Sequence, residues 1–200
     1  MPVGSVLIAL VLFQFLSVQF ALGYNGRPAT KAQVRTGVAS KTKPLVKLQM
    51  TNGAPVRLEI PSIKVEATID PVGLTSDGAM GIPDAPQDTA WYMLGPKPGE
   101  TGSAVISGHL NWWYGATGVF ARLSSLKIGD LVTVQDDQGV NTSFVVRRIR
   151  SFGQKEDATE VFFANDDGSH LNLVTCAGVW DKLLQRYSKR LVIFTDKVTE

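Results

Sequence analysis

LNLVTC, residues 171–176, is an apolar run that ends in Cys176, the only cysteine of this 200-residue chain. A second such run, RLVIF, covers residues 190–194 and begins fourteen residues after the cysteine. Short apolar runs rich in β-branched and aromatic residues are typical of buried strands. We therefore expect one strand that ends at Cys176 and another that begins at Arg190, with the thiol at the rim of the fold.

Further strands are expected along the sequence that precedes these two runs. Residues 56–61 and 63–69 alternate apolar and polar side chains, which indicates strands with one buried face. Between residues 73 and 102 turn formers recur too often for a helix, so we expect a long loop that Trp91 and Tyr92 hold against the body. Three more strands are predicted at residues 103–107, 130–135 and 143–152.

Helices are expected to be brief. Residues 119–126 place apolar side chains at a spacing of three, which is typical of a short helix. About eight short strands with little helix predict an all-β protein, and a closed or nearly closed barrel rich in antiparallel pairs would leave no exposed strand edge. The sequence shows no internal repeat and no second domain.

The start of the chain differs from the rest. Residues 3–22 contain no charged side chain, and a run of this length can cross a bilayer as a helix of about 30 Å. No clean small-x-small cleavage site follows, so an anchor is favoured over a cleaved signal peptide, with a helix buried in the fold as the third possibility. The predicted organisation is an anchor or signal at residues 1–23, a basic flexible linker at 24–54 and one folded domain at 55–200.

Charge is distributed unevenly along the chain. Residues 1–58 contain seven lysines or arginines and no acidic residue, whereas residues 59–200 contain 13 basic and 18 acidic residues. An acidic domain lacks the concentrated basic face that nucleic-acid binding requires, so no nucleic-acid partner is expected. The basic tail could lie on an anionic surface or serve only as a solvated linker.

The reactive chemistry that Cys176 offers depends on its neighbours, because the thiolate is the nucleophile and needs a nearby cation or acid. His109, in SGHL after the strand at 103–107, and Arg190 are the candidates. An arginine stabilises negative charge without losing its proton, while an imidazole can protonate a leaving amine and later accept a proton. Together these groups would meet the needs of acyl transfer. A buried structural thiol and a structural histidine are the alternatives.

Two further polar residues are weaker candidates. His170 follows the turn DDGS and is expected to cap a strand at the surface, and Arg186 lies in an expected loop at 177–189 where it would be solvated. One cysteine and two distant histidines provide no close-spaced ligand pair, so no metal is predicted. No phosphate-binding or dinucleotide motif is present, so no cofactor is predicted either.

Three motifs in this order, SGHL with His109, LNLVTC with Cys176 and RLVIF with Arg190, resemble the sortase family, and the resemblance extends over residues 56–196. It implies an eight-stranded sortase-type β-barrel and a cysteine transpeptidase. Such an enzyme would cleave a C-terminal sorting signal of the LPxTG type between Thr and Gly. The acyl group would then pass through a thioacyl intermediate to an amine of a cell-wall precursor or of a pilin.

The resemblance also implies roles for individual residues. Cys176 would be the nucleophile, His109 the general acid and base, and Arg190 the group that stabilises the substrate and the oxyanion. Thr175, just before the cysteine, would help to hold the sorting signal. No metal ligand is implied among these residues.

Location, partners and subclass follow from the same resemblance. The loop at 151–170 would form a recognition wall, and the loop at 177–189 would lie beside the nucleophile. The segments CAGVW and YSKRLVIF look nearest to class F or class D-like sortases, with housekeeping anchoring favoured over pilus polymerisation. The expected location is the extracytoplasmic face of a bacterial cell membrane, held there by the N-terminal segment. The expected partners are the sorting signals of exported proteins and a cell-wall precursor amine.

Two other functions fit part of the pattern. L,D-transpeptidases, which crosslink peptidoglycan, also use Cys and His on a β-rich fold, but their SHGC-type motif is missing, since His170 lies six residues before Cys176. A noncatalytic wall-binding barrel would have the fold without using the thiol. The sortase-type enzyme is the prediction that uses all three motifs.

Overall fold

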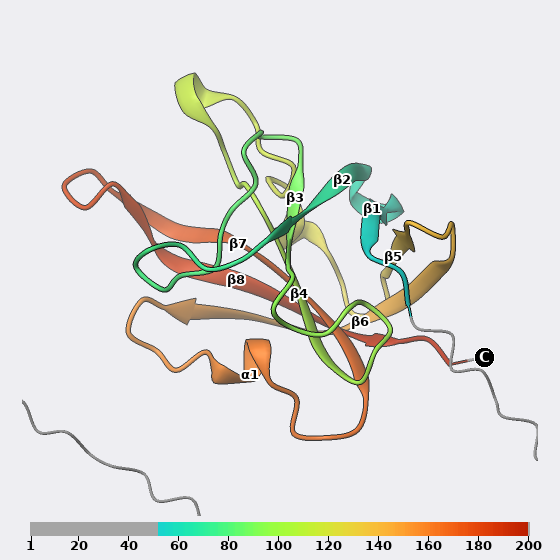
Figure 1. Cartoon of the computed structure of the whole chain (residues 1–200). Coiled ribbons are helices and arrows are strands. Elements are labelled where there is room, and N and C mark those ends of the chain that lie inside the picture. Colours follow the sequence, from blue (N-terminus) through green and yellow to red (C-terminus); the bar gives the residue numbers. More distant parts are fainter. Residues whose placement is uncertain (1–51, 200) are drawn as a thin grey trace, which may run out of the picture. The chain divides into compact units, whose positions relative to one another are not determined.

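The computed structural model describes residues 52–199, which form a closed barrel of strands with a few short helical turns (Figure 1). The helical elements are η1 (Pro61–Ile63), η2 (Trp113–Gly115), η3 (Leu123–Ser125) and α1 (Thr159–Phe162). The strands are β1 (Pro55–Ile60), β2 (Val65–Val72), β3 (Thr89–Tyr92), β4 (Gly102–Gly108), β5 (Leu131–Asp136), β6 (Asn141–Gly153), β7 (Ser169–Asp181) and β8 (Arg186–Lys197).

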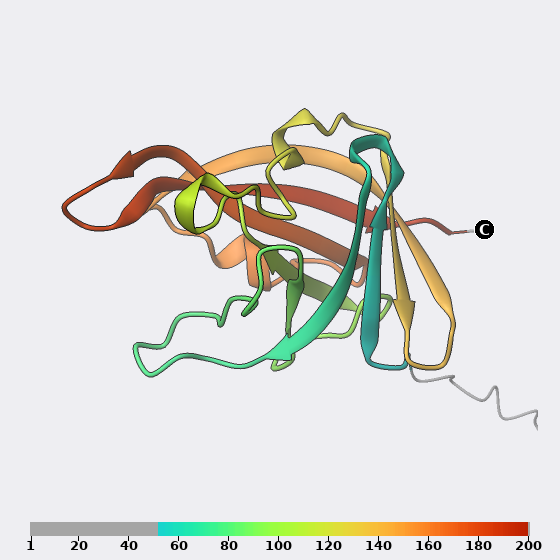
Figure 2. The same cartoon turned by 90° about the horizontal axis from the view of Figure 1, so that it is seen from above.

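The strands follow one another around the barrel in the order β1-β2-β3-β4-β7-β8-β6-β5, and β5 closes the ring by pairing with β1. The pairs β2–β3 and β4–β7 are parallel, and the other pairs are antiparallel. Seen from above, the long strands β6, β7 and β8 run across the molecule beside one another (Figure 2). The predicted all-β fold, an eight-stranded barrel rich in antiparallel pairs, is therefore confirmed.

Two local predictions were wrong. Trp91 and Tyr92 do not lie in a loop, because they belong to β3, a strand of four residues inside the range 73–102. Four residues between Gly- and Pro-rich turns are too few for a periodic pattern to stand out. The helix expected at 119–126 is also absent, since η3 is the only helical turn in that range.

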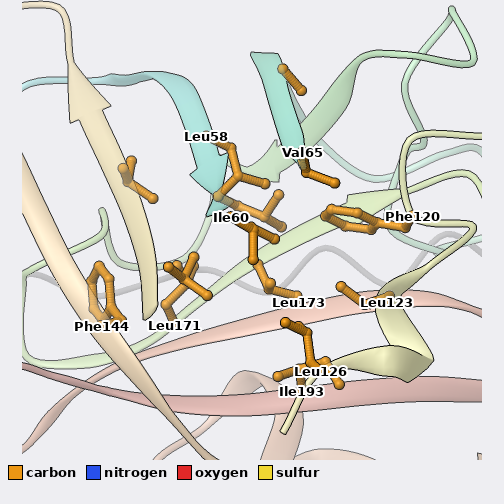
Figure 3. Close-up of a cluster of buried hydrophobic side chains, with 14 of the residues drawn as sticks. Leu58, Ile60, Val65, Phe120, Leu123, Leu126, Phe144, Leu171, Leu173 and Ile193 are labelled. Atoms are coloured by element: carbon orange, nitrogen blue, oxygen red, sulfur yellow. The ribbon is translucent and has the colours of Figure 1, made fainter. Parts of the chain in front are cut away.

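Apolar side chains from all eight strands fill the barrel interior (Figure 3). The connection between β4 and β5 adds Phe120, Leu123 and Leu126, which are buried in the same cluster. This connection is therefore fixed by burial of its apolar side chains, which explains why their regular spacing does not produce a helix. Removing such surface from water supplies the main favourable free energy of the fold.

A second, smaller apolar cluster lies on the outer side of the sheet. It consists of Val105, Phe152, Val161 and Val192, from β4, β6, α1 and β8. Successive side chains of a strand point to opposite faces, so these strands contribute to the interior and to this outer cluster at the same time. The Nδ2 amide of Asn172 on β7 donates a hydrogen bond to the carbonyl of Val161 at 2.7 Å, which fastens α1 to the outer face.

The predicted anchor at residues 1–23 and most of the predicted linker at 24–54 lie outside the described residues. Within residues 52–199 no helix is both long and apolar enough to cross a membrane. The division of the chain into three parts stays a prediction.

Candidate active site

Cys176 and Arg190 occupy directly opposite positions on β7 and β8. Opposite residues of an antiparallel pair project from the same face of the sheet and are close neighbours there. Cys176 is partly exposed, so its thiol can be reached from solvent. The pairing of the two strands thus brings the candidate nucleophile and the candidate guanidinium to adjacent positions.

The strand boundaries around this pair differ from those expected. Arg190 does not begin a strand, because β8 already begins at Arg186, and β7 continues past Cys176 to Asp181. The range 177–189 is therefore a two-stranded hairpin and not a loop. The paired backbone groups of a hairpin hold this segment more firmly than a loop would.

A bulge follows directly after the cysteine. The register of β7 and β8 shifts between Ala177 and Trp180, and Gly178 between them has a φ of 80°. That left-handed conformation favours glycine, and a Cβ at Gly178 would also lie 2.4 Å from Ser188 Oγ. Bulges bend a strand and increase its twist, so this one lets the hairpin change direction after Cys176.

His109 reaches the same end of the sheet through β4. Because β4 and β7 are parallel neighbours, the chain runs along both strands in the same direction. His109 follows the last residue of β4, Gly108, whose carbonyl accepts a buried hydrogen bond of 2.8 Å from Thr175 Oγ1. This bond joins the residue before His109 to the residue before Cys176.

Contacts with three segments hold His109 in place. Its Nε2 lies 2.8 Å from the carbonyl oxygen of Pro83, and because a carbonyl only accepts, Nε2 carries the proton. The ring of Trp112 packs edge-on against the imidazole at 4.6 Å between centroids. The backbone carbonyl of His109 accepts a hydrogen bond of 2.9 Å from the Phe120 amide. Gly118 lies so close that a Cβ there would be 2.2 Å from the same carbonyl oxygen.

Arg190 projects from the exposed surface of β8 toward an open cavity of about 510 Å³. Its Nη1 donates hydrogen bonds to the carbonyl of Lys189 at 3.0 Å and to that of Tyr187 at 3.4 Å. These neutral partners leave the charge of the guanidinium available to an anionic group. The cavity is lined by Arg190 and, among others, by Met80, Ile82, Ser107, Phe162, Val174 and Val192.

Ser107 and Val174 also line this cavity, although neither was expected there from the sequence. Ser107 Oγ is shielded from solvent and has no hydrogen-bond partner within the described part of the chain. Ser107 lies two residues before His109, and Val174 lies two residues before Cys176. Because side chains two apart on a strand share a face, this spacing could have identified both.

The sortase domain model matches residues 58–198. The chain belongs to the sortase family. Sortases are cysteine transpeptidases, so this protein is an enzyme of that type. No curated protein resembles the chain closely enough to count as a match.

Solved sortase structures share the fold of this sortase at low sequence identity. Sortase C-1 from Actinomyces oris has a TM-score of 0.56 and 23% identity, and the match covers 73% of this chain and 76% of that one. The sortase D5 transpeptidase from Clostridium perfringens has a TM-score of 0.55 and 21% identity, and the match covers 74% of this chain and 81% of that one. Sortase C1 from Streptococcus agalactiae has a TM-score of 0.56 and 20% identity, and the match covers 72% of this chain and 67% of that one. Similarity to both class C and class D structures leaves the predicted class F or D-like assignment a prediction.

His170 lies away from the cavity and joins two carboxylates. Its Nδ1 is 2.9 Å from Asp196 Oδ1 and its Nε2 is 2.8 Å from Asp166 Oδ1. Burial alone would lower the pKa of His170, but the hydrogen bonds to Asp166 and Asp196 outweigh it and raise the pKa above the usual value. Carboxylates only accept, so both ring nitrogens donate and the imidazole is charged. Among residues 52–199 no group of three or more His, Cys, Asp or Glu side chains could hold a metal ion.

The close contact at Gly118 predicts that Gly118→Ala disturbs His109. The new methyl group would meet a backbone carbonyl, and overpacking of this kind costs typically about 1–3 kcal/mol. We expect a lower free energy of unfolding in urea and a shifted His109 imidazole resonance in the NMR spectrum. The His170 resonance should not move. Gly73→Ala is the matched control, because its Cβ would meet only Met93 Cε at 3.9 Å. An unchanged His109 resonance in Gly118→Ala would contradict the prediction.

The charged His170 predicts a pH-dependent contribution to stability. Since its pKa is raised in the folded state, the stabilisation is fully present below the unfolded pKa of about 6.5 and is lost as pH rises through the folded pKa. Urea unfolding of the wild type and of His170→Gln should therefore differ most near pH 5.5 and least near pH 9. A difference that stays constant across this range would show that the imidazole is neutral in the fold.

Proposed function

We propose that this sortase cleaves an LPxTG-like sorting signal through a thioacyl intermediate on Cys176 and transfers the protein to a cell-wall amine. The observation that supports this most directly is the position of Cys176 opposite Arg190, with His109 at the end of the parallel neighbour β4. Membership of the sortase family makes an L,D-transpeptidase the poorer explanation of the same residues.

In the proposed acylation step the Cys176 thiolate attacks the carbonyl carbon of the threonine in the signal. The guanidinium of Arg190 stabilises the negative charge that develops on the carbonyl oxygen, and it does so without giving up a proton. His109 then donates a proton to the glycine nitrogen as the C–N bond breaks. The products are a thioester on Cys176 and a free glycine amine.

In the proposed transfer step an amine of the cell-wall precursor attacks the thioester carbon. His109 accepts the proton that this amine loses, and the C–S bond breaks to release the Cys176 thiolate. The net change is the exchange of one amide for another. No external energy source or cofactor is required for this exchange.

The open cavity supports the proposed binding of a peptide. It lies beside Arg190 and has apolar walls from Val174, Val192 and Phe162, which suit the leucine and proline of an LPxTG-like signal. Parts of the range 151–170 line it, and we propose that they form the recognition wall. Thr175 is 3% exposed and its hydroxyl is bonded within the barrel, so we propose that it holds the signal indirectly, by positioning Cys176.

The proposed location is the extracytoplasmic face of a bacterial membrane, where sorting signals and wall precursors are both present. Sortases act at the bacterial cell surface, and residues 3–22 would supply the anchor to the membrane. The proposed partners are exported proteins with a C-terminal sorting signal and a wall precursor with a free amine.

The proposed nucleophile predicts that Cys176→Ala abolishes turnover. Incubation of the wild type with an LPxTG peptide should give an adduct at Cys176 in the intact-protein mass spectrum, and the alanine variant should give none. Peptide cleavage should fall by several orders of magnitude, since loss of a nucleophile removes the covalent path. Unchanged cleavage by the variant would show that Cys176 is not the nucleophile, and absence of both adduct and cleavage in the wild type would leave a noncatalytic barrel as the explanation of the fold.

The proposed role of Arg190 is separable from a general effect of positive charge on β8. Loss of a group that stabilises an oxyanion costs about 10²–10³ in kcat, which is the fall expected for Arg190→Ala on the peptide. Lys197→Ala removes an equal charge from the other end of the same strand, outside this cavity, and should stay within a few-fold of the wild type. Equal losses in both variants would indicate a general effect of positive charge.

A further inference from the structure

Exposed apolar side chains are carried by the β7–β8 hairpin, beyond the position of Cys176. The hairpin extends past the closed part of the barrel in the two views (Figures 1 and 2). Leu183 at the hairpin turn is 94% exposed and Val179 is 76% exposed. We call this set the apolar rim, and it consists of Val179, Trp180, Leu183 and Leu184.

The hairpin turn is built so that two leucines point into solvent. Asp181 Oδ1 accepts hydrogen bonds from the amides of Leu183 and Leu184 at 2.9 and 3.0 Å, and Gln185 has a φ of 47°. Glycine, asparagine, aspartate, proline and serine are the usual residues of turns. Because Asp181 already satisfies both amides, the leucine side chains are not needed to form the turn and are available for a contact outside the domain.

The hairpin that carries these leucines is braced along its length. The rings of Trp180 and Tyr187 pack across the two strands with centroids 5.1 Å apart and an interplanar angle of 64°. Below them the amide of Val179 donates a hydrogen bond of 3.0 Å to Ser188 Oγ. The exposed side chains are therefore presented on an ordered support, which lowers the entropy lost when they dock.

Charge distinguishes the hairpin from the rest of the domain. Residues 179–190 contain four basic residues and one acidic residue, whereas the rest of 59–200 contains nine basic and 17 acidic residues. Lys182 and Arg186 take part in none of the ion pairs formed by residues 52–199. An anionic surface would attract this hairpin and repel the body of the domain, which fixes the direction of approach.

We propose that the apolar rim docks on the surface of an anionic phospholipid bilayer. Leucine and tryptophan side chains would enter the boundary between head groups and acyl chains, and Lys182 and Arg186 would lie among the phosphates. An anionic wall polymer offers phosphate without hydrocarbon, and a neutral bilayer offers hydrocarbon without charge. The combination of apolar and basic residues on one hairpin matches the surface that supplies both.

Docking in this orientation turns the Cys176 end of the barrel toward the membrane. If the proposed function is correct, this end is where a sorting signal leaving the bilayer would arrive. The docking does not depend on catalysis, so the two proposals are tested by separate measurements.

Tryptophan fluorescence of the full chain tests the docking. All four tryptophans lie between residues 91 and 180, so residues 1–51 contribute no signal however they bind to lipid. Vesicles of phosphatidylglycerol or of phosphatidylcholine, each with brominated acyl chains, quench tryptophans that reach the hydrocarbon boundary. In the vesicle-bound fraction we expect stronger quenching with phosphatidylglycerol. Leu183→Ser/Leu184→Ser should reduce this quenching by about half, and Lys182→Gln/Arg186→Gln should reduce the difference between the two lipids.

Ile128→Ser/Leu131→Ser is the matched control, because it removes two exposed apolar residues that lie outside the apolar rim. This control should be quenched like the wild type. Cleavage of an LPxTG peptide in solution should be unchanged by the two leucine substitutions, so that a failure of docking is distinguished from a failure of the proposed function. Equal quenching of the wild type and the leucine variant, or equal quenching in both lipids, would overturn the proposal and leave a protein partner or a second copy as the occupant.

Discussion

The parallel contact between β4 and β7 is the constraint on which the rest of the site depends. Thr175 and Gly108 are 67 residues apart in the sequence, yet a buried hydrogen bond of 2.8 Å joins them. Because the sheet is closed, β4 cannot slip against β7 without a compensating shift of register elsewhere in the ring. The positions of His109 and Cys176 are therefore set by backbone pairing. Side-chain contacts then only need to refine an arrangement that the barrel already imposes.

Because side chains alternate along β7, one face of the strand contributes to the core and the other face carries the candidate site. Leu173 and Thr175 face the barrel interior and are buried there, while Val174 and Cys176 face the outer side. On β8, Ile193 faces inward in the same way. A substrate can thus bind on one face of a strand whose other face is part of the core. This arrangement combines a rigid support with an accessible thiol.

The sequence predicts most of the fold because alternation marks the first two strands and apolar runs mark the later ones, and it predicts the candidate site because the site residues adjoin the strands predicted from those runs. It misses β3, since Trp91 has too few strand neighbours to form a pattern. It mistakes the segment around Phe120 for a helix, because a spacing of three is also produced by irregular chain packed against a core. It places a loop at 177–189, since the bulge at Gly178 interrupts the period that would have shown β7 continuing. Only at Phe120 do tertiary contacts override a local signal, whereas at β3 and at the bulge the local signal is too short or interrupted.

The bulge at Gly178 also separates the barrel part of β7 and β8 from the hairpin that follows it. On one side of Gly178 the strands are part of the closed barrel, and Cys176 is held opposite Arg190 by the register there. On the other side the same two strands form a hairpin that extends beyond the barrel, where Trp180 is paired only with its cross-strand neighbour. A change of register separates the two halves, so twisting of the hairpin need not alter the pairing at the cysteine. The extension can therefore vary in sequence, and in what it contacts, while the geometry around the thiol is preserved.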